Sequence, residues 1–254
     1  MRIAIIDDDQ VSLKIAANFL RSEGEQLSCY SSAESFQCEK DKNFDLVLCD
    51  YDLRTSTGVD VMIDYLEKNP ETVFVLITAY WDLDVVVQAW HSGAYDFVKK
   101  PVDIDYLELL LSQVEARKPR NEQQFLNQMT RSLKKEERID KVKFAELKAN
   151  LEENVFKSAL DQTAEELIYG YQSISRSIFS SESQKTTEIC HRLIGTVANF
   201  GLNRLGEKLE EVQQAVQSGK DVETPYQQLG KELKLTLIAL KIMNDEIPSA
   251  PKSA

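Results

Sequence analysis

Five short apolar runs, separated by longer amphipathic stretches, dominate the first half of the chain and constrain its fold. The runs cover residues 3–6, 27–30, 44–49, 73–77 and 95–98. Parallel strands that are covered on both faces have continuous apolar runs of this length. Between and after the runs, apolar residues recur at helical spacing, for example at Val59, Ile63 and Leu66. This alternation predicts a five-stranded, doubly wound parallel α/β sheet with right-handed crossovers.

The second half of the chain has a helical pattern throughout. Apolar residues recur three and four positions apart, as at Leu202, Leu205 and Leu209, and breaks fall near 180–183, 200–201 and 219–221. Several helices with short connections predict an antiparallel four-helix bundle. The expected domains are a sheet domain at 1–117, a charged helical connector at 118–144, a bundle at 145–247 and a disordered tail at 248–254.

The 254-residue chain carries a formal charge of −12, and the excess lies in one half. Residues 1–117 have 10 Lys and Arg against 22 Asp and Glu, whereas the remaining residues have 20 of each. Because phosphate backbones attract positive charge, we expect no nucleic-acid partner. No run approaches the ~18 apolar residues of a membrane span, and the N-terminus lacks a signal segment. These features predict a cytoplasmic protein without membrane contact.

The four cysteines and two histidines lack the spacing of a metal site. No Cys-x-x-Cys pair occurs, so we expect reduced thiols rather than a zinc centre. Of the two histidines, His91 has no motif around it and is interpreted as structural.

Reactive side chains follow the predicted strands. Asp7 and Asp8 end the first run, Asp50 the third and Thr78 the fourth, and Lys100 follows the fifth. The carboxyl ends of parallel strands converge at one edge of a sheet, where α/β proteins form their sites. Converging carboxylates repel one another unless a hard cation lies among them, and Mg²⁺ prefers oxygen ligands. The set predicts a Mg²⁺-assisted phosphoryl site, with Asp50 on the central strand as its nucleophile.

Residues 1–117 resemble the receiver domain of two-component response regulators, which has a flavodoxin-like fold. The likeness rests on the segments IAIIDDD, DLVLCD, LITAY and GAYDFVKKP, and on Gly58, eight residues after Asp50. It implies that Asp50 accepts a phosphoryl group from a sensor histidine kinase or another phosphohistidine donor. It also implies that Asp7, Asp8 and Asp50 bind Mg²⁺ together with the backbone carbonyl of Asp52.

The same likeness assigns a switch and shows one departure. Thr78 and Lys100 would contact the phosphoryl group, and Thr78 would act with Phe97 as the conformational switch. Asp52 and Tyr80 stand where family members tune the lifetime of the phosphoaspartate. The family usually has proline four residues after the phosphoacceptor, whereas this chain has Arg54, which predicts a looser loop.

A histidine in the second half lies in a helical pattern with an unusual neighbour. Helical geometry directs Cys190, Leu193 and Val197 to the core and places His191 and Gly195 on another face. A glycine inside a helix costs about 1 kcal/mol against alanine, so its presence needs a reason. One turn after His191 it removes side-chain bulk beside the imidazole. The pattern predicts a histidine open to an incoming active site.

Residues 145–245 resemble a histidine-containing phosphotransfer (HPt) domain, which would exchange phosphate with receiver or HPt proteins. Leu193, Gly195 and Gly201 match the motif, and Gln213 stands where some members place an amide near the phosphohistidine. The departure is Ile194, because the family nearly always has lysine there. The likeness implies that the motif histidine, His191, is a phosphoacceptor.

Three functions are therefore considered. The first is a phosphorelay protein that joins a receiver to an HPt-like bundle. The second is a receiver whose bundle serves docking or homodimerisation, which Ile194 motivates. The third is a phosphohydrolase, because Asp50-Tyr51-Asp52 also suits an aspartyl nucleophile. No glycine-rich nucleotide loop is present, so we expect self-catalysed phosphoryl transfer rather than conventional enzyme turnover.

Overall fold

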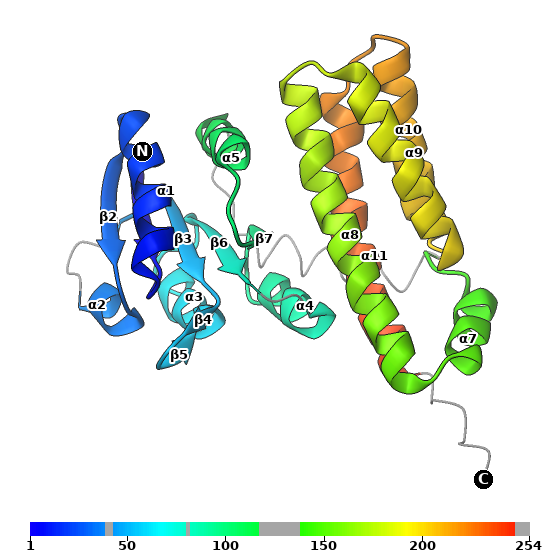
Figure 1. Cartoon of the computed structure of the whole chain (residues 1–254), viewed down its shortest axis with the longest axis horizontal. Coiled ribbons are helices and arrows are strands. Elements are labelled where there is room, and N and C mark those ends of the chain that lie inside the picture. The colour runs from blue at the N-terminus through cyan, green and yellow to red at the C-terminus, as the bar shows by residue number, and fades with distance from the viewer. Residues whose placement is uncertain (39–42, 80–81, 117–137, 247–254) are drawn as a thin grey trace. The chain divides into compact units, whose positions relative to one another are not determined.

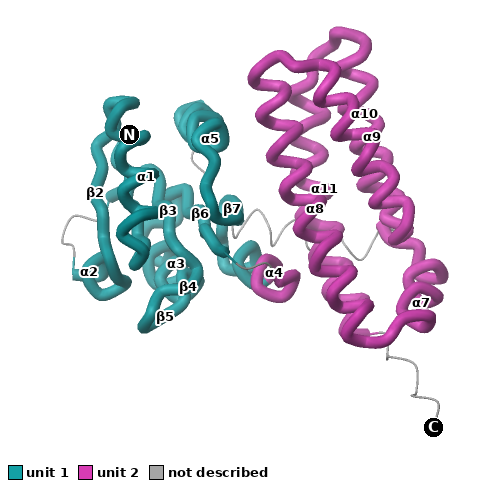
Figure 2. Tube along the Cα trace, in the orientation of Figure 1, with its two compact units in different colours: residues 1–81, 88–128 teal, residues 82–87, 129–254 magenta. Residues whose placement is uncertain are grey.

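The computed structural model describes residues 1–38, 43–79, 82–116 and 138–246 (Figure 1). The chain separates into two compact units, coloured separately in Figure 2. The sheet unit comprises residues 1–81 and 88–128, and the helical unit comprises 82–87 and 129–254. Most of the predicted connector, the predicted tail and Tyr80 lie outside the described residues.

A parallel sheet forms the centre of the sheet unit. Its strands are β1 (Arg2–Ile6), β2 (Gln26–Tyr30), β3 (Leu46–Asp50), β6 (Val73–Thr78) and β7 (Asp96–Lys99). They lie in the order β2-β1-β3-β6-β7, and all neighbours are parallel. This confirms the predicted five-stranded sheet. The chain crosses from one side of β1 to the other before β3, so the topological switch point lies between β1 and β3.

Helices cover both faces of this sheet (Figure 1). They are α1 (Gln10–Ser22), α2 (Ala33–Gln37), α3 (Gly58–Leu66), α4 (Leu83–His91) and α5 (Ile104–Ala116). On one face, Leu20 of α1 and Leu110 of α5 share a buried cluster with Leu48 of β3. Elsewhere, Phe36 of α2 and Tyr65 of α3 are both buried, with their ring centroids 5.3 Å apart. Burial on both faces explains why β3 is apolar at nearly every position.

The helical unit is built from α7 (Lys141–Asn150), α8 (Glu153–Phe179), α9 (Ser183–Asn199), α10 (Asn203–Gln217) and α11 (Glu223–Glu246). Helix α9 packs against α8 and α10, and α11 packs against α10 and α8. Each of these four helices buries an apolar stripe at three-and-four spacing, such as Leu205, Leu209 and Val212 in α10. No helix of the described residues is long and apolar enough to span a membrane.

Helix α7 crosses the predicted boundary between connector and bundle at residue 144. Asp140 caps its start by accepting hydrogen bonds from the backbone amides of Val142 and Lys143 at 3.1 and 3.0 Å. Phe144 is fully buried, and its ring lies 5.4 Å from that of Phe156 in α8. The end of the predicted connector is therefore part of the packed helical unit.

Candidate functional site

The strand register brings three carboxylates to the switch point of the sheet. Ile6 of β1 pairs with Cys49 of β3, so the residues that follow them, Asp7 and Asp50, are neighbours. One oxygen each of Asp7, Asp8 and Asp50 lies within 4.8 Å of the others. Asp7 and Asp50 are buried, and Asp8 is partly exposed. The predicted convergence of these side chains is therefore present.

Lys100 supplies a positive charge inside this cluster. Thr78 of β6 pairs with Lys99 of β7, and the amide of Lys100 donates to the carbonyl oxygen of Thr78 at 2.6 Å. The Lys100 Nζ lies 2.6 Å from Asp50 Oδ2 and 2.9 Å from Asp7 Oδ2. The end of the fifth strand thus delivers an ammonium group to the carboxylate at the end of the third.

The surroundings raise the pKa values of both Asp50 and Lys100. Burial raises the pKa of Asp50, although the hydrogen bond from Lys100 opposes that shift. Burial acts to lower the pKa of Lys100, but its hydrogen bonds to Asp50 and Asp7 outweigh burial and raise it. Lys100 therefore stays positively charged at neutral pH. It can neutralise an anionic group placed beside Asp50.

Thr78 and Phe97, the residues of the predicted switch, are both buried in the sheet unit. Thr78 is buried at the end of β6, next to the strand that ends in Asp50. The Phe97 side chain is fully buried, and its ring centroid lies 6.3 Å from that of Tyr51, the residue after Asp50. The aromatic ring is therefore turned into the domain in this structure. Its role as a switch stays a prediction.

Gly58 allows the loop after Asp50 to return against the strand that it leaves. A Cβ atom at this position would lie 2.4 Å from the Asp50 carbonyl oxygen and 2.8 Å from Leu76 Cδ2. The Gly58 amide also donates to the carbonyl of Tyr51 at 2.7 Å. Backbone atoms cannot yield as a flexible side chain does, so only glycine fits.

The substitution Gly58→Ala is expected to destabilise the sheet unit by about 1–3 kcal/mol, because overpacking displaces the Asp50 backbone. The two tryptophans, Trp81 and Trp90, both lie in the first half of the chain, so tryptophan fluorescence follows the unfolding of this half in urea. Gly195→Ala is the matched control, because a Cβ there meets nothing within 4 Å. Equal urea midpoints for both variants and the wild type would contradict the packing argument.

The loop after β3, which Arg54 is expected to loosen, forms polar contacts in the structure, and its looseness stays a prediction. Residues 52–57 form a short hairpin of β4 (Asp52–Leu53) and β5 (Ser56–Thr57), in which Asp52 pairs with Thr57. Its turn residue Thr55 donates to Glu34 Oε1 of α2 at 2.5 Å, and Arg54 pairs with Asp8. These polar contacts tie the hairpin to Glu34 of α2 and to Asp8. The Asp52 amide is 3.3 Å from Asp50 Oδ1, and the role of its carbonyl as a metal ligand stays a prediction.

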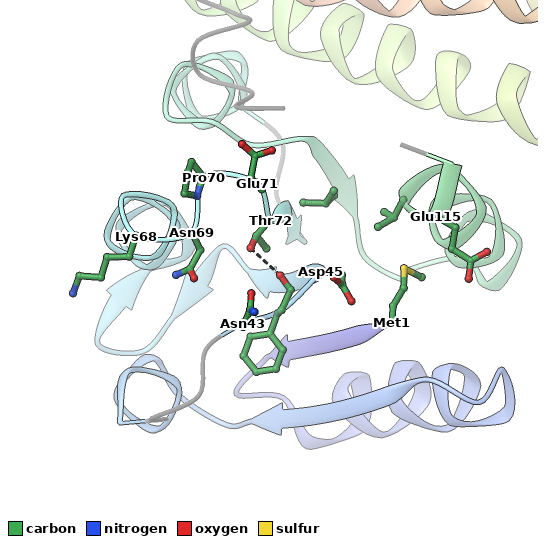
Figure 3. Close-up of a pocket in the computed structure, with 12 residues that line it drawn as sticks. Met1, Asn43, Asp45, Lys68, Asn69, Pro70, Glu71, Thr72 and Glu115 are labelled. Carbon is green, nitrogen blue, oxygen red and sulfur yellow. Dashed lines mark hydrogen bonds between the residues drawn. The ribbon is translucent and has the colours of Figure 1, made fainter. Parts of the chain in front are cut away.

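A cavity of about 530 Å³ lies at the N-terminal ends of the strands, opposite the carboxylate cluster (Figure 3). It is lined by residues before β3 and β6, among them Asp45 and Thr72, and by Met1 and Glu115. Thr72 Oγ1 donates to the Phe44 carbonyl at 2.8 Å and ties the two loops together. These residues precede the strands, whereas Asp50 ends one, so the cavity is separate from the carboxylate cluster.

Comparison with known proteins decides the family of the sheet unit. Residues 3–112 match the family model described as the response regulator receiver domain. This segment is a receiver domain. Receiver domains bind Mg²⁺ through acidic residues and take phosphoryl groups from histidine kinases. The carboxylate cluster of this receiver domain has the residue types for both tasks.

Curated relatives share part of their length with the chain. The transcriptional regulatory protein ZraR of Klebsiella oxytoca is 33% identical over 115 residues, which are 45% of this chain and 26% of that protein. A cyclic di-GMP phosphodiesterase of Thermotoga maritima is 30% identical over 135 residues, 53% of this chain and 36% of that protein. The chain therefore spans about a quarter to a third of the length of these relatives.

Among solved structures, a BeF₃-activated receiver domain of DrrB, a Thermotoga maritima protein, is similar to the chain. The identity is 27%, the alignment covers 46% of this chain and 97% of that one, and the TM-score is 0.44.

In the helical unit, α9 presents His191 to solvent. Cys190, Leu193 and Val197 are buried, as predicted, and His191 and Gly195 are exposed. A Cβ at Gly170 of α8 would lie 2.6 Å from Leu193 Cδ1, so the two helices cross closely there and fix the rotation of α9. The imidazole makes no hydrogen bond or ion pair with any described residue. The histidine is thus accessible.

Gly195 is not required by the packing of the helical unit. A Cβ at this position would meet no atom within 4 Å, so alanine would fit without any displacement. The thiol of Cys190 is buried, and burial raises its pKa to about 12, so it is no competing nucleophile. The open space beside His191 therefore serves no internal contact.

The basic residue next to His191 is engaged elsewhere. Arg192 forms a short ion pair with Glu166 of α8, and Thr196 donates to the same carboxylate at 3.2 Å. Arg192 and Thr196 therefore face α8. Ile194 is partly buried at the position where the HPt motif has lysine. Neither residue supplies the missing cation beside the histidine.

Gln213 lies on the face of α10 that is turned toward α9. A Cβ at Gly206 would lie 3.5 Å from Val197 Cγ2, which places Gly206 against α9. Gln213 is two helical turns after Gly206 and thus shares its face. In an antiparallel pair, seven residues forward on α10 correspond to seven residues back from Val197 on α9. This places Gln213 at the level of Cys190 and His191.

Proposed function

We propose that this protein is a phosphorelay component whose receiver domain accepts a phosphoryl group on Asp50. The observation that carries the proposal is the bonding of Lys100 to both Asp50 and Asp7 at the end of β3. This arrangement pairs a buried carboxylate with a fixed positive charge and adds further acidic ligands beside it. A partner phosphohistidine, as in a sensor histidine kinase, is the donor.

The transfer follows from the groups at this site. An Asp50 carboxylate oxygen attacks the phosphorus of the donor, the P–N bond breaks, and the imidazole nitrogen keeps the bonding electron pair. Lys100 neutralises charge on the transferred group, and the Thr78 hydroxyl donates to one of its oxygens. The buried cluster limits access of water to the acyl phosphate. Movement of Thr78 toward the phosphoryl group, with Phe97, then signals the modified state.

Mg²⁺ fits this cluster because every side-chain ligand is a carboxylate oxygen, the donor type that the ion prefers. Asp7, Asp8 and Asp50, with the Asp52 backbone carbonyl, would hold it. When bound, it neutralises oxygen charge on the phosphoryl group and on the carboxylates.

We further propose that α8–α11 form an HPt-like four-helix bundle in which His191 exchanges phosphate with a receiver. Support comes from the exposed imidazole, from the space beside Gly195 and from the position of Gln213 on α10. The receiver is that of this chain, in the same molecule or in a second copy, or that of another protein.

The substitution Gly195→Ala tests whether this space serves transfer. We expect the helical unit to become more stable by about 0.5–1 kcal/mol, because alanine has the higher helix propensity. Phosphoryl transfer to His191 should slow by at least about tenfold, because the added methyl group misplaces the incoming receiver. Urea unfolding followed by circular dichroism and the rate of histidine labelling measure the two effects. Unchanged transfer would show that the glycine has no part in it.

The second candidate function is a docking or dimerisation bundle. Ile194 and the engagement of Arg192 by Glu166 favour it, because both leave His191 without a nearby cation. Exposed apolar side chains on the helical unit, such as Tyr169 and Phe179, also suit a partner. In that case His191→Gln would leave signalling intact.

One experiment tests the function class. The full chain is incubated with Mg²⁺ and either acetyl phosphate or p-nitrophenyl phosphate. We expect about one alkali-labile phosphoryl group on Asp50 from acetyl phosphate and no repeated release of phosphate from the aryl ester. Sustained turnover would favour the phosphohydrolase.

The prediction that the chain contacts no nucleic acid gains no support from relatives that are named transcriptional regulators.

A further inference from the structure

The third carboxylate of the cluster, that of Asp8, pairs with Arg54 rather than with Lys100. Lys100 bonds to Asp7 and Asp50, whereas Arg54 Nε lies 2.7 Å from Asp8 Oδ2. The Arg54 side chain is 81% exposed and that of Asp8 is 23% exposed. The guanidinium therefore covers the acidic cluster from its solvent side.

The backbone around Arg54 is anchored on three sides. Leu53 is buried, Asp52 pairs with Thr57 across the hairpin, and Thr55 donates to Glu34 of α2. The hydrogen bond from Thr55 also lowers the pKa of Glu34, which keeps that carboxylate charged as an acceptor. The anchored hairpin therefore keeps the Arg54 side chain within reach of Asp8.

The charges of the cluster give this pair a consequence. Three carboxylates and Lys100 carry a formal charge of −2, and Arg54 reduces it to −1. A divalent cation that needs Asp8 as a ligand meets a carboxylate that already pairs with a guanidinium through Oδ2. The guanidinium competes with the ion for this carboxylate and also weakens the attraction of the cluster for the ion.

We propose that Arg54 is an internal counter-cation that competes with divalent metal ions for Asp8 and so sets the Mg²⁺ affinity of the receiver domain. The inference rests on the proposed phosphoacceptor site and adds that Arg54 regulates how tightly this site binds Mg²⁺. Arg54 leaves Asp8 when the metal ion enters, which frees the guanidinium at the exposed rim of the site. High salt screens the exposed pair, so the competition weakens as ionic strength rises.

Calorimetric titration of the full chain with MgCl₂ at an ionic strength of about 0.15 M tests this proposal. We expect Arg54→Ala to bind Mg²⁺ about tenfold more tightly than the wild type, and Arg54→Lys, which keeps the charge, to stay within about threefold of it. Arg21→Ala is the matched control, because it removes the same charge from the exposed last turn of α1. Arg21 lies about 16 Å along α1 from the start of that helix, beyond the screening length of about 8 Å. The Mg²⁺ affinity of Arg21→Ala should therefore match that of the wild type.

The outcomes separate this inference from the function on which it rests. Equal Mg²⁺ affinities of Arg54→Ala and the wild type, or weaker binding by Arg54→Ala, would overturn the competition while leaving the metal site in place. An equal gain in Arg21→Ala would also overturn it, because the effect would then be one of net charge. If neither the wild type nor any variant binds Mg²⁺, the metal site itself fails, and with it both proposals.

Discussion

Asp50→Asn is expected to abolish phosphorylation of the receiver domain by acetyl phosphate. Asparagine keeps the shape of the side chain and an oxygen that accepts from Lys100, but an amide is no nucleophile. We expect the initial rate of alkali-labile labelling to fall by at least about a thousandfold, as happens when a nucleophile is removed. The measurement uses radiolabelled acetyl phosphate, Mg²⁺ and the full chain.

Asp64→Asn is the matched control for this prediction. Asp64 is an exposed carboxylate on α3 of the same domain, so its loss changes the net charge equally without touching the cluster. We expect wild-type labelling from this variant. Alkali-labile label that persists in Asp50→Asn would place the phosphoacceptor elsewhere in the chain.

The second large effect is expected from His191→Gln. This variant should keep alkali-labile label on Asp50 and lose the alkali-stable, acid-labile label that marks phosphohistidine. The reason is the exposed imidazole of His191, which is the acceptor nitrogen of the proposed relay. Because glutamine is polar and His191 packs against no core residue, the fold should be unaffected. Separate acid and alkali treatment of the labelled chain measures the two fractions.

The other histidine of the chain provides the control for this prediction. His91→Gln changes the exposed last residue of α4, and the chain contains no third histidine. We expect its alkali-stable, acid-labile label to equal that of the wild type. Retention of alkali-stable, acid-labile label in His191→Gln, or its loss in His91→Gln, would contradict the assignment.

The sheet was predictable because its strands are covered on both faces. β3 is buried at every residue, and its sequence is apolar up to Asp50. β2 has a weaker pattern because it lies at the edge of the sheet and is only partly buried. The helix α2 could not be predicted, since five residues do not complete two turns of a periodic pattern. The hairpin of β4 and β5 could not be predicted either, because each strand has only two residues.

The site was predictable only where topology fixes it. Parallel strands bring Asp7 and Asp50 together whatever their side chains do, so the sequence predicts their convergence. The pair of Arg54 with Asp8 depends on a hairpin turn, and no periodicity reports such a turn. In the sequence, Arg54 indicates only that the usual proline is absent. A basic residue close after the predicted nucleophile was the signal that could have indicated an ion pair with the cluster.

In the helical half, too, the sequence predicts what a single helix determines but not the contacts between helices. The exposure of His191 follows from the buried stripe of α9, which helical spacing predicts. The engagement of Arg192 by Glu166 depends on how α8 crosses α9, and a single helix pattern carries no information about its neighbour. The space beside His191 is predicted from Gly195 itself, and the structure adds that no neighbouring helix fills it.

Complementation between two variants tests the relay most directly. The His191→Gln chain, labelled on Asp50 and freed of acetyl phosphate, is mixed in the presence of Mg²⁺ with the Asp50→Asn chain, which retains His191. The account predicts that label leaves the donor and appears on the acceptor as acid-labile phosphohistidine. Label that stays on the donor until it is hydrolysed, with none on the acceptor, would contradict it.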